Sequence, residues 1–412
     1  MSNKYLSMRK VKLNREYRKN LMQEYEARIH SPSAIIFDFF VGEYPLFVVL
    51  TPRLHALIVS IHKDSSRLSN LQNYALPGVA RGWYINKILV DEIKLTNDME
   101  NVHSTRQEVK EAVDRIEQSG RPRNIRFYGM ASKYTSILNH SVDVLKTCAD
   151  VRKLYDEFVA QEVVAEDVKD TIDGQIFRSK TVYVQDSHGK IVHEGAHPES
   201  VIIESMEKAL SILNDTETDG LIRVAVFHYL FGYIHPFYNG NGRLSRYISS
   251  MVLSNELSTL AGLRLSFVIK DHKREYDSLF RNANDARSMG DLTDFVETFL
   301  GYIHKSLQDM IETLQSGQKA IDEMDRFIGN TEAFKGREKP IEILILNGLF
   351  AEEALSIDDL KRHAQCGRPA AQKAIDLARE MGLLTQERQG HRYLYTIRPD
   401  AWIGFAEKVL SH

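Results

Sequence analysis

The twelve-residue segment from 235 to 246, which reads His-Pro-Phe-Tyr-Asn-Gly-Asn-Gly-Arg-Leu-Ser-Arg, combines residue types that suit phosphoryl or nucleotidyl transfer. His235 carries an imidazole with an ordinary pKa of about 6.5, so it can take up a proton near neutral pH. Gly240, Asn241 and Gly242 permit positive φ angles and a close approach of a ligand to the backbone. They precede a predicted helix, whose first amides have no partners within the helix and therefore suit an anion.

Two arginines complete this anion cradle, which we define as the backbone of residues 240–242 together with the guanidinium groups of Arg243 and Arg246. The two arginines lie three residues apart, so both can face one ligand. Each offers a planar fork of donors for phosphate oxygens. A glycine-rich turn with solvated arginines would explain a lone Gly-Asn-Gly, but the whole segment favours a transfer site.

The elements that must position this segment are mostly helices. Residues 221–234 are apolar on nearly all sides, which predicts a helix at the centre of a domain, and a second helix is expected from 243 to about 256. Residues 103–172 are also predicted to be helical. Between them, residues 177–184 are rich in β-branched and aromatic types and are followed by a turn at 186–189, which predicts a β-hairpin.

The segment resembles the sequence signature of the Fic family, His-x-Phe-x-acidic-Gly-Asn-Gly-Arg-x-x-Arg. Seven of its eight defined positions match, and the exception is Asn239, where the family has Asp or Glu. The resemblance covers residues 75 to 305. It implies a mostly α protein with a helical Fic core and a β-hairpin flap.

The resemblance also implies an activity, protein adenylylation with ATP and Mg²⁺. His235 would be the general base that deprotonates a Ser, Thr or Tyr hydroxyl on a target protein. The hydroxyl oxygen would attack the α-phosphate, and pyrophosphate would leave. The amides of 240–242 would hold the α- and β-phosphates, Arg243 and Arg246 would neutralise the β- and γ-phosphates, and Phe237 would anchor the loop in the core.

Two further features follow from the resemblance. The flap, with Phe177, Val182 and Val184, would dock a target segment by strand pairing. Asn239 would hold Mg²⁺ in place of the usual carboxylate, although an amide oxygen brings no charge. Weaker metal binding, another diphosphate-containing donor, a metal-poor reaction and simple tolerance of the amide all stay open at this point.

A second short motif lies near the start of this region. Residues 96–101, Thr-Asn-Asp-Met-Glu-Asn, fit the family's inhibitory pattern Ser/Thr-x-x-x-Glu-Gly/Asn, in which Thr96, Glu100 and Asn101 are the defined positions. The resemblance implies that Glu100 pairs with Arg246 and misplaces ATP. The alternatives are an ordinary solvated helix end, and a glutamate that orients a water to remove AMP from a modified target.

The last part of the chain, residues 337–412, has the pattern of a winged helix: three predicted helices and a two-stranded hairpin. Ser356 with Asp359 predicts a capping box. Pro369 near the start of the following helix, and Gly382 at its end, also fit. The expected domains are therefore an N-terminal region with an inhibitory helix (1–102), a Fic core (103–328) and the winged helix (337–412).

A winged helix can bind DNA, which makes a transcriptional regulator with a nucleotide-sensing Fic core the rival hypothesis. Basic residues lie on or near the expected recognition helix and wing: Arg368, Lys373, Arg379, Arg388 and Arg392. Residues 337–412 nevertheless contain eleven Lys and Arg and eleven Asp and Glu, so the basic footprint that phosphate contacts need is diluted. A protein-contact or dimerisation role is the other alternative.

The composition sets the remaining bounds. The chain has 412 residues, too many for one ordinary domain, and a net charge of -3, which steers it to neither nucleic acid nor an anionic membrane. Cys148 and Cys366 have no metal-like spacing and indicate reduced thiols in the cytoplasm. The first twenty residues do not fit a secretory signal, and we expect no contact with a membrane. Self-modification and pairing of two Fic cores are further expectations, and residues 1–75 have no predicted role.

Overall fold

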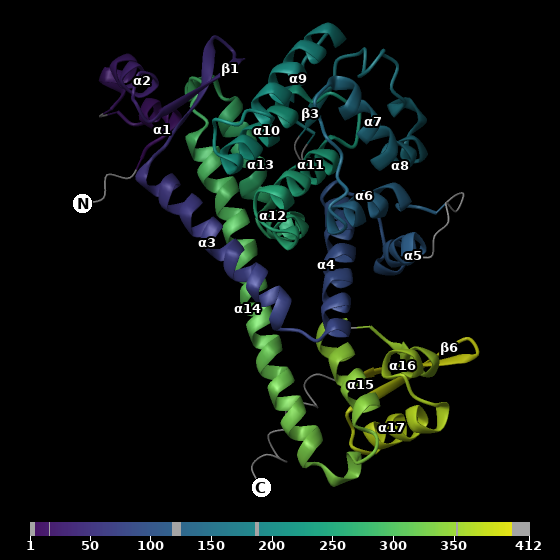
Figure 1. Cartoon of the computed structure of the whole chain (residues 1–412). Coiled ribbons are helices and arrows are strands. Elements are labelled where there is room, and N and C mark those ends of the chain that lie inside the picture. Colours follow the sequence, from purple (N-terminus) through teal and green to yellow (C-terminus); the bar gives the residue numbers. More distant parts are fainter. Residues whose placement is uncertain (1–4, 16, 118–124, 186–188, 352, 398–412) are drawn as a thin grey trace. The chain divides into compact units, whose positions relative to one another are not determined.

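The computed structural model describes residues 5–15, 17–117, 125–185, 189–351 and 353–397. In these ranges the chain is mainly helical with short β-hairpins, which confirms the predicted fold class (Figure 1). The predicted hairpin turn at 186–188 and residues 398–412 of the predicted winged helix lie outside the described residues.

The chain forms two compact units, one of residues 1–66 and 89–308 and one of residues 67–88 and 309–412. These units do not follow the boundaries that the sequence predicts after residues 102 and 328. The reason is that three long helices each contribute to both units: α3 (Pro52–Tyr74), α4 (Gly78–Met99) and α14 (Thr293–Asn330).

The first unit holds most of the shorter elements. In chain order they are α1 (Met8–Leu13), η1 (Arg18–Asn20), α2 (Leu21–Ile29), β1 (Ala34–Val41), β2 (Tyr44–Val49), α5 (Arg106–Glu117), α6 (Tyr128–Leu138), α7 (Cys148–Phe158), α8 (Ala160–Glu166), η2 (Val168–Asp170), β3 (Tyr183–Gln185), β4 (Ile191–Glu194), α9 (Glu199–Leu213), α10 (Gly220–Ile234), α11 (Asn241–Glu256), η3 (Thr259–Arg264), α12 (Leu265–Asp271), α13 (Lys273–Asn284) and η4 (Ala286–Ser288).

Helix α10 is the centre of this unit, as its sequence predicts. Most of its side chains are buried on every side of the helix, and it packs against α9, α11 and α13. It begins at a capping residue, Asp219, whose side chain accepts a hydrogen bond from the amide of Leu221. Its other end leads directly into the predicted site.

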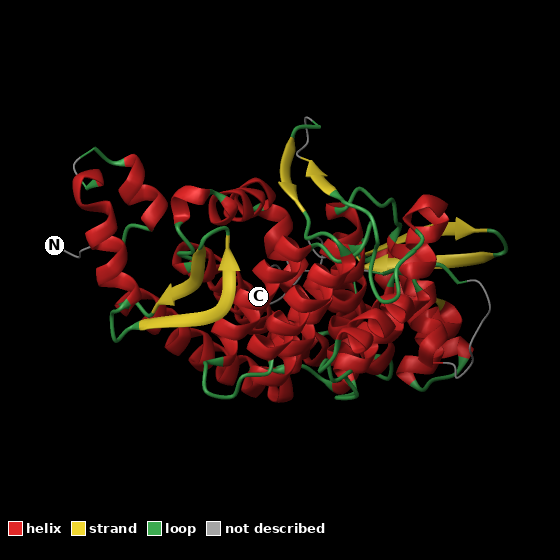
Figure 2. Ribbon diagram, turned by 90° about the horizontal axis from the view of Figure 1, so that it is seen from above, coloured by secondary structure: helices red, strands yellow, loops and turns green. Residues whose placement is uncertain are grey.

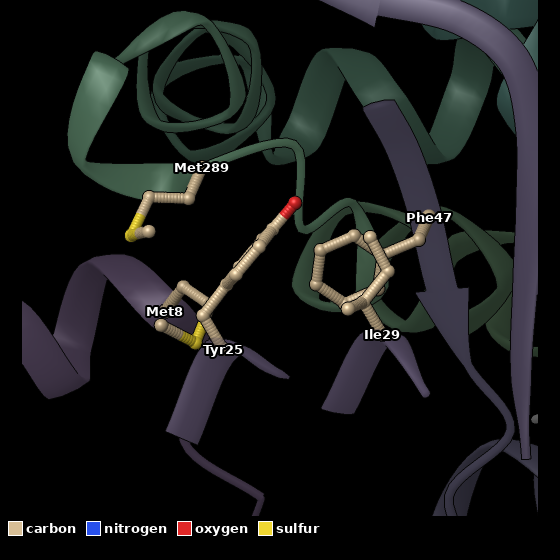
Figure 3. Packing of buried hydrophobic residues seen from close by; sticks show 5 residues of the cluster. All are labelled: Met8, Tyr25, Ile29, Phe47 and Met289. Carbon is tan, nitrogen blue, oxygen red and sulfur yellow. The ribbon is translucent and has the colours of Figure 1, made fainter. Parts of the chain in front are cut away.

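The apolar run 34–50 contains the two strands of the β1–β2 hairpin. Phe47 on β2 exchanges backbone hydrogen bonds with Gly290 and Leu292, just before α14. A small core joins these parts and consists of Met8, Tyr25, Ile29, Phe47 and Met289 (Figure 3). Parts of the segment before residue 75, to which the sequence assigns no role, are therefore packed against the residues that lead into α14.

The β3–β4 hairpin exists, but its first strand is shorter than predicted. Residues 177–182 form no ladder, and β3 begins only at Tyr183. It pairs antiparallel with β4, with Val184 opposite His193. Phe177 has no exposed surface because its side chain packs in the core, and its part in docking a target by strand pairing stays a prediction. Figure 2 shows the hairpin standing out from the helices next to it.

The second unit contains a small domain with three helices and a three-stranded sheet in the order β5-β7-β6. Its elements are η5 (Glu332–Phe334), α15 (Glu338–Phe350), β5 (Leu355–Ser356), α16 (Ile357–Ala364), α17 (Arg368–Glu380), β6 (Leu384–Gln389) and β7 (Arg392–Ile397). The capping box of Ser356 and Asp359 is confirmed, and strand β5 was not predicted. The order of elements is the one expected of a winged helix, and the assignment to that fold stays a prediction.

The polar stretch 329–340, between the predicted Fic core and the predicted winged helix, is mostly structured. Helix α14 continues to Asn330, and Pro340 lies in the first turn of α15, where its missing amide hydrogen is tolerated. In the described part of the chain, no helix combines the length and apolar character needed to cross a membrane.

Candidate active site

The predicted site is the sharp connection between α10 and α11. His235 ends α10 in the left-handed region at φ 53°, which is uncommon for a residue with a side chain. Its amide still donates to the carbonyl of Phe231 at 3.0 Å. Of the three residues predicted to permit positive φ, Gly240 adopts it, at φ 80°. The loop therefore reverses direction at both of its ends.

The middle of the loop is fixed in the core. Phe237 is fully buried, stacks on Tyr155 with ring centroids 3.8 Å apart, and meets the edge of Phe177. The side chain of Asn241 accepts from the amide of Phe237 at 3.0 Å and donates to its carbonyl at 2.8 Å. Asn241 thus closes the loop on itself through its side chain, a contribution beyond the backbone amide that the sequence predicts.

Asn239 faces hydrogen-bond donors. Its Oδ1 accepts from the amide of Gly240 at 2.6 Å and lies 3.5 Å from Nη2 of Arg243. An amide oxygen that already accepts from N–H groups is a poor ligand for Mg²⁺. The metal-binding role of Asn239 stays a prediction.

Arg246 is buried and is bound by the end of α4. Its Nε donates to Thr96 Oγ1 at 2.8 Å, and its Nη2 donates to the carbonyl of Thr96 at 2.9 Å and to Glu100 Oε1 at 2.8 Å. Only 2% of its side chain is exposed. The structure thus brings together the arginine and the glutamate that the two sequence motifs predict as partners, although they lie 146 residues apart.

The carboxylate of Glu100 lies directly against the start of α11. A Cβ atom on Gly242 would meet Glu100 Oε1 at 2.1 Å, so this position has room for the carboxylate only because it is a glycine. Burial opposes ionisation of Glu100, but the charge and hydrogen bond of Arg246 outweigh it, and the pKa of Glu100 is lowered. An anion therefore occupies the first turn of α11, where the helix amides and dipole favour negative charge.

Asn101 contributes through its backbone. It adopts φ 59°, is exposed, and its amide donates to the carbonyl of Asp98 at 3.1 Å, so it lets the chain turn after α4. This explains why the third defined position of the inhibitory motif is a residue that tolerates the left-handed conformation.

Arg243 points to a partner that the sequence does not predict. Its Nη1 and Nη2 donate to Oε1 and Oε2 of Glu166, at the end of α8, at 3.0 and 3.3 Å. The arginine side chain has no exposed surface. Arg243 and Arg246 are therefore held by different carboxylates. Nothing local marks Glu166, because it lies 77 residues before Arg243 and is the last residue of an ordinary short helix.

The imidazole of His235 is neutral at physiological pH. Burial and, next, the charge of Arg178 lower its pKa to about 4, while a hydrogen bond with the Gly232 backbone works in the opposite direction. The neutral ring can accept a proton. Arg178 itself donates to the carbonyls of His235, Lys180 and Ala196 at 2.9, 2.5 and 2.8 Å. The sequence analysis did not single out Arg178.

Of the residues predicted to dock a target, Val182 and Val184 lie at the hairpin. The carbonyl of Val182 accepts from the amide of Gly195 at 3.0 Å, and Val184 lies within β3. A second histidine of the region, His228, is fully buried on α10 between Ser249 and Tyr276. His228 is therefore a core residue and is not part of the site.

Comparison with known proteins finds a family match for the part of the chain that contains this loop. The model of the Fic/DOC family matches residues 147–253, which include α7 to α11 and the loop with His235. The protein adenylyltransferase Fic of Drosophila yakuba is 30% identical over 138 residues, and that of Drosophila melanogaster is 29% identical over the same length. Each alignment covers 34% of this chain, and the chain spans about a quarter of the length of these curated relatives, 25%.

The fold of this chain is also similar to that of a solved structure. A Fic family protein from Desulfovibrio desulfuricans G20 superimposes with a TM-score of 0.50 and 21% identity, over 85% of this chain and 97% of the other. The similarity therefore extends beyond the matched domain at the level of the fold. With the loop of residues 235–246, these matches show that residues 147–253 form a domain of the Fic/DOC family.

Proposed function

We propose that this protein transfers AMP from ATP to a hydroxyl group of a protein and that Glu100 restrains the reaction. The observation that carries the proposal is the carboxylate of Glu100 against the start of α11, bonded to Arg246, on the same loop–helix unit as a neutral histidine. The names of the Drosophila relatives support adenylyl transfer as the reaction. Both the donor and the acceptor belong to this proposal.

The chemistry assigns one task to each group. The imidazole nitrogen of His235 that does not contact Gly232 takes the proton of a Ser, Thr or Tyr hydroxyl. The hydroxyl oxygen forms a bond to the α-phosphorus, and the bond from that phosphorus to the bridging oxygen breaks, which releases pyrophosphate. The first amides of α11 and the guanidinium of Arg246 stabilise the phosphate charge.

Glu100 restrains this reaction by competition for the same donors. A phosphate oxygen needs the Nη2 hydrogen that Glu100 now accepts, and it needs the space above Gly242 that the carboxylate fills. Two anions in one helix N-terminus repel each other. ATP therefore binds in a reactive pose only when the carboxylate moves away or is removed.

The identity of the transferred group is tested with ATP labelled either at the α- or at the γ-phosphorus, in the Glu100→Gly variant. We expect protein-bound label from α-³²P and none from γ-³²P, and no label after the further change His235→Ala. His30→Ala is the control, because the His30 side chain is 76% exposed, follows α2 and has no assigned role in the site. Label from γ-³²P would show phosphorylation and contradict the proposal.

One observation favours removal of AMP from a modified protein as a second activity. Glu100 bonds Arg246 through Oε1, and no hydrogen bond of Oε2 is recorded within the described ranges. A free carboxylate oxygen beside the anion cradle suits a general base for water. The two activities are separated by adding AMP-labelled protein to wild type and to Glu100→Gly. Loss of label with wild type alone supports removal.

The alternative of a DNA-binding regulator has less support. Three basic side chains of the small domain pair with acidic neighbours, and one of them, Arg379, belongs to the predicted footprint: Lys361 with Asp358, Arg362 with Asp359, and Arg379 with Asp376. Such pairs reduce the positive field that DNA phosphates require. A contact with protein therefore suits this domain better.

A further inference from the structure

A buried arginine lies at the base of the β3–β4 hairpin. Arg178 has no exposed surface, and no ion pair of this residue is recorded among the residues that the structure describes. A buried charge without a counter-ion is costly unless hydrogen bonds compensate it. Three carbonyl oxygens supply them here, those of Lys180, Ala196 and His235. The arginine is therefore held in one orientation.

These three carbonyls belong to three separate segments of the chain. Lys180 precedes β3 and Ala196 follows β4, so they mark the two ends of the hairpin. His235 is the proposed base. One rigid guanidinium thus joins both ends of the hairpin to the backbone of the catalytic residue, and the planar fork fixes the angles between them.

Backbone hydrogen bonds accompany this junction on both sides. The amide of Arg178 donates to the carbonyl of Pro236 at 3.3 Å, and the amide of Ala196 donates to the carbonyl of Ile234 at 3.0 Å. The two ends of the hairpin are therefore hydrogen-bonded to the two neighbours of His235 in the chain, Ile234 and Pro236. A displacement of either end pulls on the peptide groups that orient the imidazole.

The atoms at this junction are closely packed. A Cβ atom on Gly195 would lie 2.5 Å from Nη2 of Arg178 and 3.1 Å from Cβ of His235. The hairpin backbone is thus in direct contact with both side chains. Close packing of this kind transmits small shifts instead of absorbing them.

We propose that Arg178 is a positioning residue that couples the seating of a target segment on the β3–β4 hairpin to the orientation of His235. This inference rests on the proposed function, because it assigns proton transfer to His235. His235 holds an uncommon left-handed conformation, and its carbonyl is fixed by Arg178. Without the hydrogen bond from Arg178 to the His235 carbonyl, the imidazole is no longer held in the orientation that faces the target hydroxyl.

Arg178 also acts on the charge of the base. After burial, its positive charge is the next contribution that lowers the pKa of His235. A purely structural arginine at another place would not change this pKa. The titration of His235 therefore distinguishes a residue that positions and tunes the base from one that only stabilises the hairpin.

The test compares Arg178→Lys, Arg178→Met and Arg152→Met in the Glu100→Gly background. Arg152 is a matched control because it also fastens this segment, through the carbonyl of Ile176 at 3.0 Å and an ion pair with Asp156, without touching the loop of His235. Measured quantities are kcat for label transfer, KM for ATP, and the titration of the His235 imidazole by NMR. Arg178→Lys keeps the charge and is expected to fold even where Arg178→Met does not.

For both Arg178 variants we expect kcat to fall by about 10- to 100-fold relative to Arg152→Met, with little change in KM for ATP, because a misaimed base affects the chemical step. The His235 titration stays near pH 4 in Arg178→Lys and moves upward in Arg178→Met. Equal kcat values in Arg178→Lys and Arg152→Met overturn the inference.

A failure of the proposed function gives a different pattern. If the Glu100→Gly protein with intact His235 and Arg178 transfers no label, adenylyl transfer is wrong. The NMR titration then decides the coupling by itself. A His235 midpoint that moves upward in Arg178→Met supports the arginine as its neighbouring charge, and an unchanged midpoint in folded protein overturns it.

Discussion

The two arginines of the anion cradle lie one turn apart on α11, and their surroundings differ. Arg246 is bound by Thr96 and Glu100 at the end of α4, before the matched Fic/DOC region, whereas Arg243 is bound by Glu166 within it. The carboxylate of Glu100 also covers Gly242. No atom of Glu166 is among the nearest neighbours of Gly240 or Gly242, so the contact with the loop glycines distinguishes Glu100 from Glu166. The same residue type thus has Thr96 and Glu100 as partners at one position and Glu166 at the other, and of the two glutamates only Glu100 lies against Gly242.

This difference implies different roles. Under the proposed function, the hydrogen bond from Nη2 of Arg246 to Glu100 is released to a ligand when Glu100 leaves, whereas the bonds to Thr96 remain. Both terminal nitrogens of Arg243 are engaged by a carboxylate, and its Nε is buried without a hydrogen-bond partner in the described ranges. Arg246 therefore suits phosphate binding, and Arg243 suits the support of the loop.

The largest expected effect is on the Arg246 side. In the Glu100→Gly background, Arg246→Met is expected to lower AMP transfer by about 10²- to 10³-fold, because a charged donor in the cradle is lost. Single-turnover transfer of α-labelled ATP measures it. Arg274→Met, at an exposed position on α13, is the control and should leave the rate unchanged. A normal rate in the Arg246 variant would contradict its role as a phosphate donor.

On the Arg243 side, the expected effect is on stability. Arg243→Met leaves Glu166 without its partner and is expected to lower the free energy of unfolding by about 3 kcal/mol. Urea unfolding measures this. The control is Arg106→Met, which removes a more exposed ion pair with Asp91 and should cost less than about 1 kcal/mol. A stable Arg243 variant that cannot transfer AMP would show that Arg243 binds phosphate, as the sequence predicts.

The sequence predicts the Arg246 side well for a physical reason. Both partners belong to short local patterns, since the glutamate follows a threonine at a fixed helical spacing and the arginine begins a helix after a glycine-rich loop. The mostly helical fold and the central α10 also follow from local periodicity.

The Arg243 side and the hairpin base depend on tertiary contacts. Glu166 and Arg178 are ordinary charged residues in sequence, and only the fold brings them to Arg243 and to the carbonyl of His235. Phe177 shows the same limit. Its β-forming neighbours predict a strand, but burial against Phe237 takes it into the core.

The pH dependence of stability provides a test with a smaller expected effect, at Glu92, whose pKa is influenced by the charge of Arg246. Glu92, on the same helix as Thr96, is fully buried, and both of its oxygens accept from the amide of Ser266 at 3.0 Å. Burial outweighs these hydrogen bonds and raises its pKa from 4.5 to about 7. Because the folded protein binds more protons than the unfolded chain in this window, stability falls as pH rises from 4.5 to 7 and is level above it.

The slope of this loss is at most about 1.4 kcal/mol per pH unit. Urea unfolding at several pH values measures it, and Glu92→Gln should remove the Glu92 contribution. Glu312→Gln, on an exposed part of α14, is the control that should keep the slope. An unchanged slope in Glu92→Gln would show that Glu92 titrates normally.

The smallest expected effect concerns Asn239, beside Arg243. Asn239→Asp supplies a carboxylate where the side chain now faces N–H donors. We expect Mg²⁺ to bind several-fold more tightly in the presence of ADP, because Mg²⁺ prefers carboxylate oxygen. Calorimetric titration of Mg²⁺ measures this, with Asn214→Asp, far from the loop in sequence, as the control. Equal affinity for Mg²⁺ in the two variants would show that the new carboxylate forms an ion pair with Arg243 and does not bind the metal.

The central claim is that Glu100 and the phosphates of ATP compete for the start of α11. The most direct measurement is the rate of AMP transfer from α-labelled ATP in wild type, Glu100→Gly and Asp98→Gly. Asp98 is the matched control because it lies two residues away and pairs with Lys94 and Lys270 instead of Arg246. The account predicts a rate that rises at least tenfold in Glu100→Gly and stays at the wild-type level in Asp98→Gly, since one charged hydrogen bond is worth about 1.5 kcal/mol or more. A Glu100→Gly protein that is folded, binds ATP and transfers no faster than wild type would contradict it.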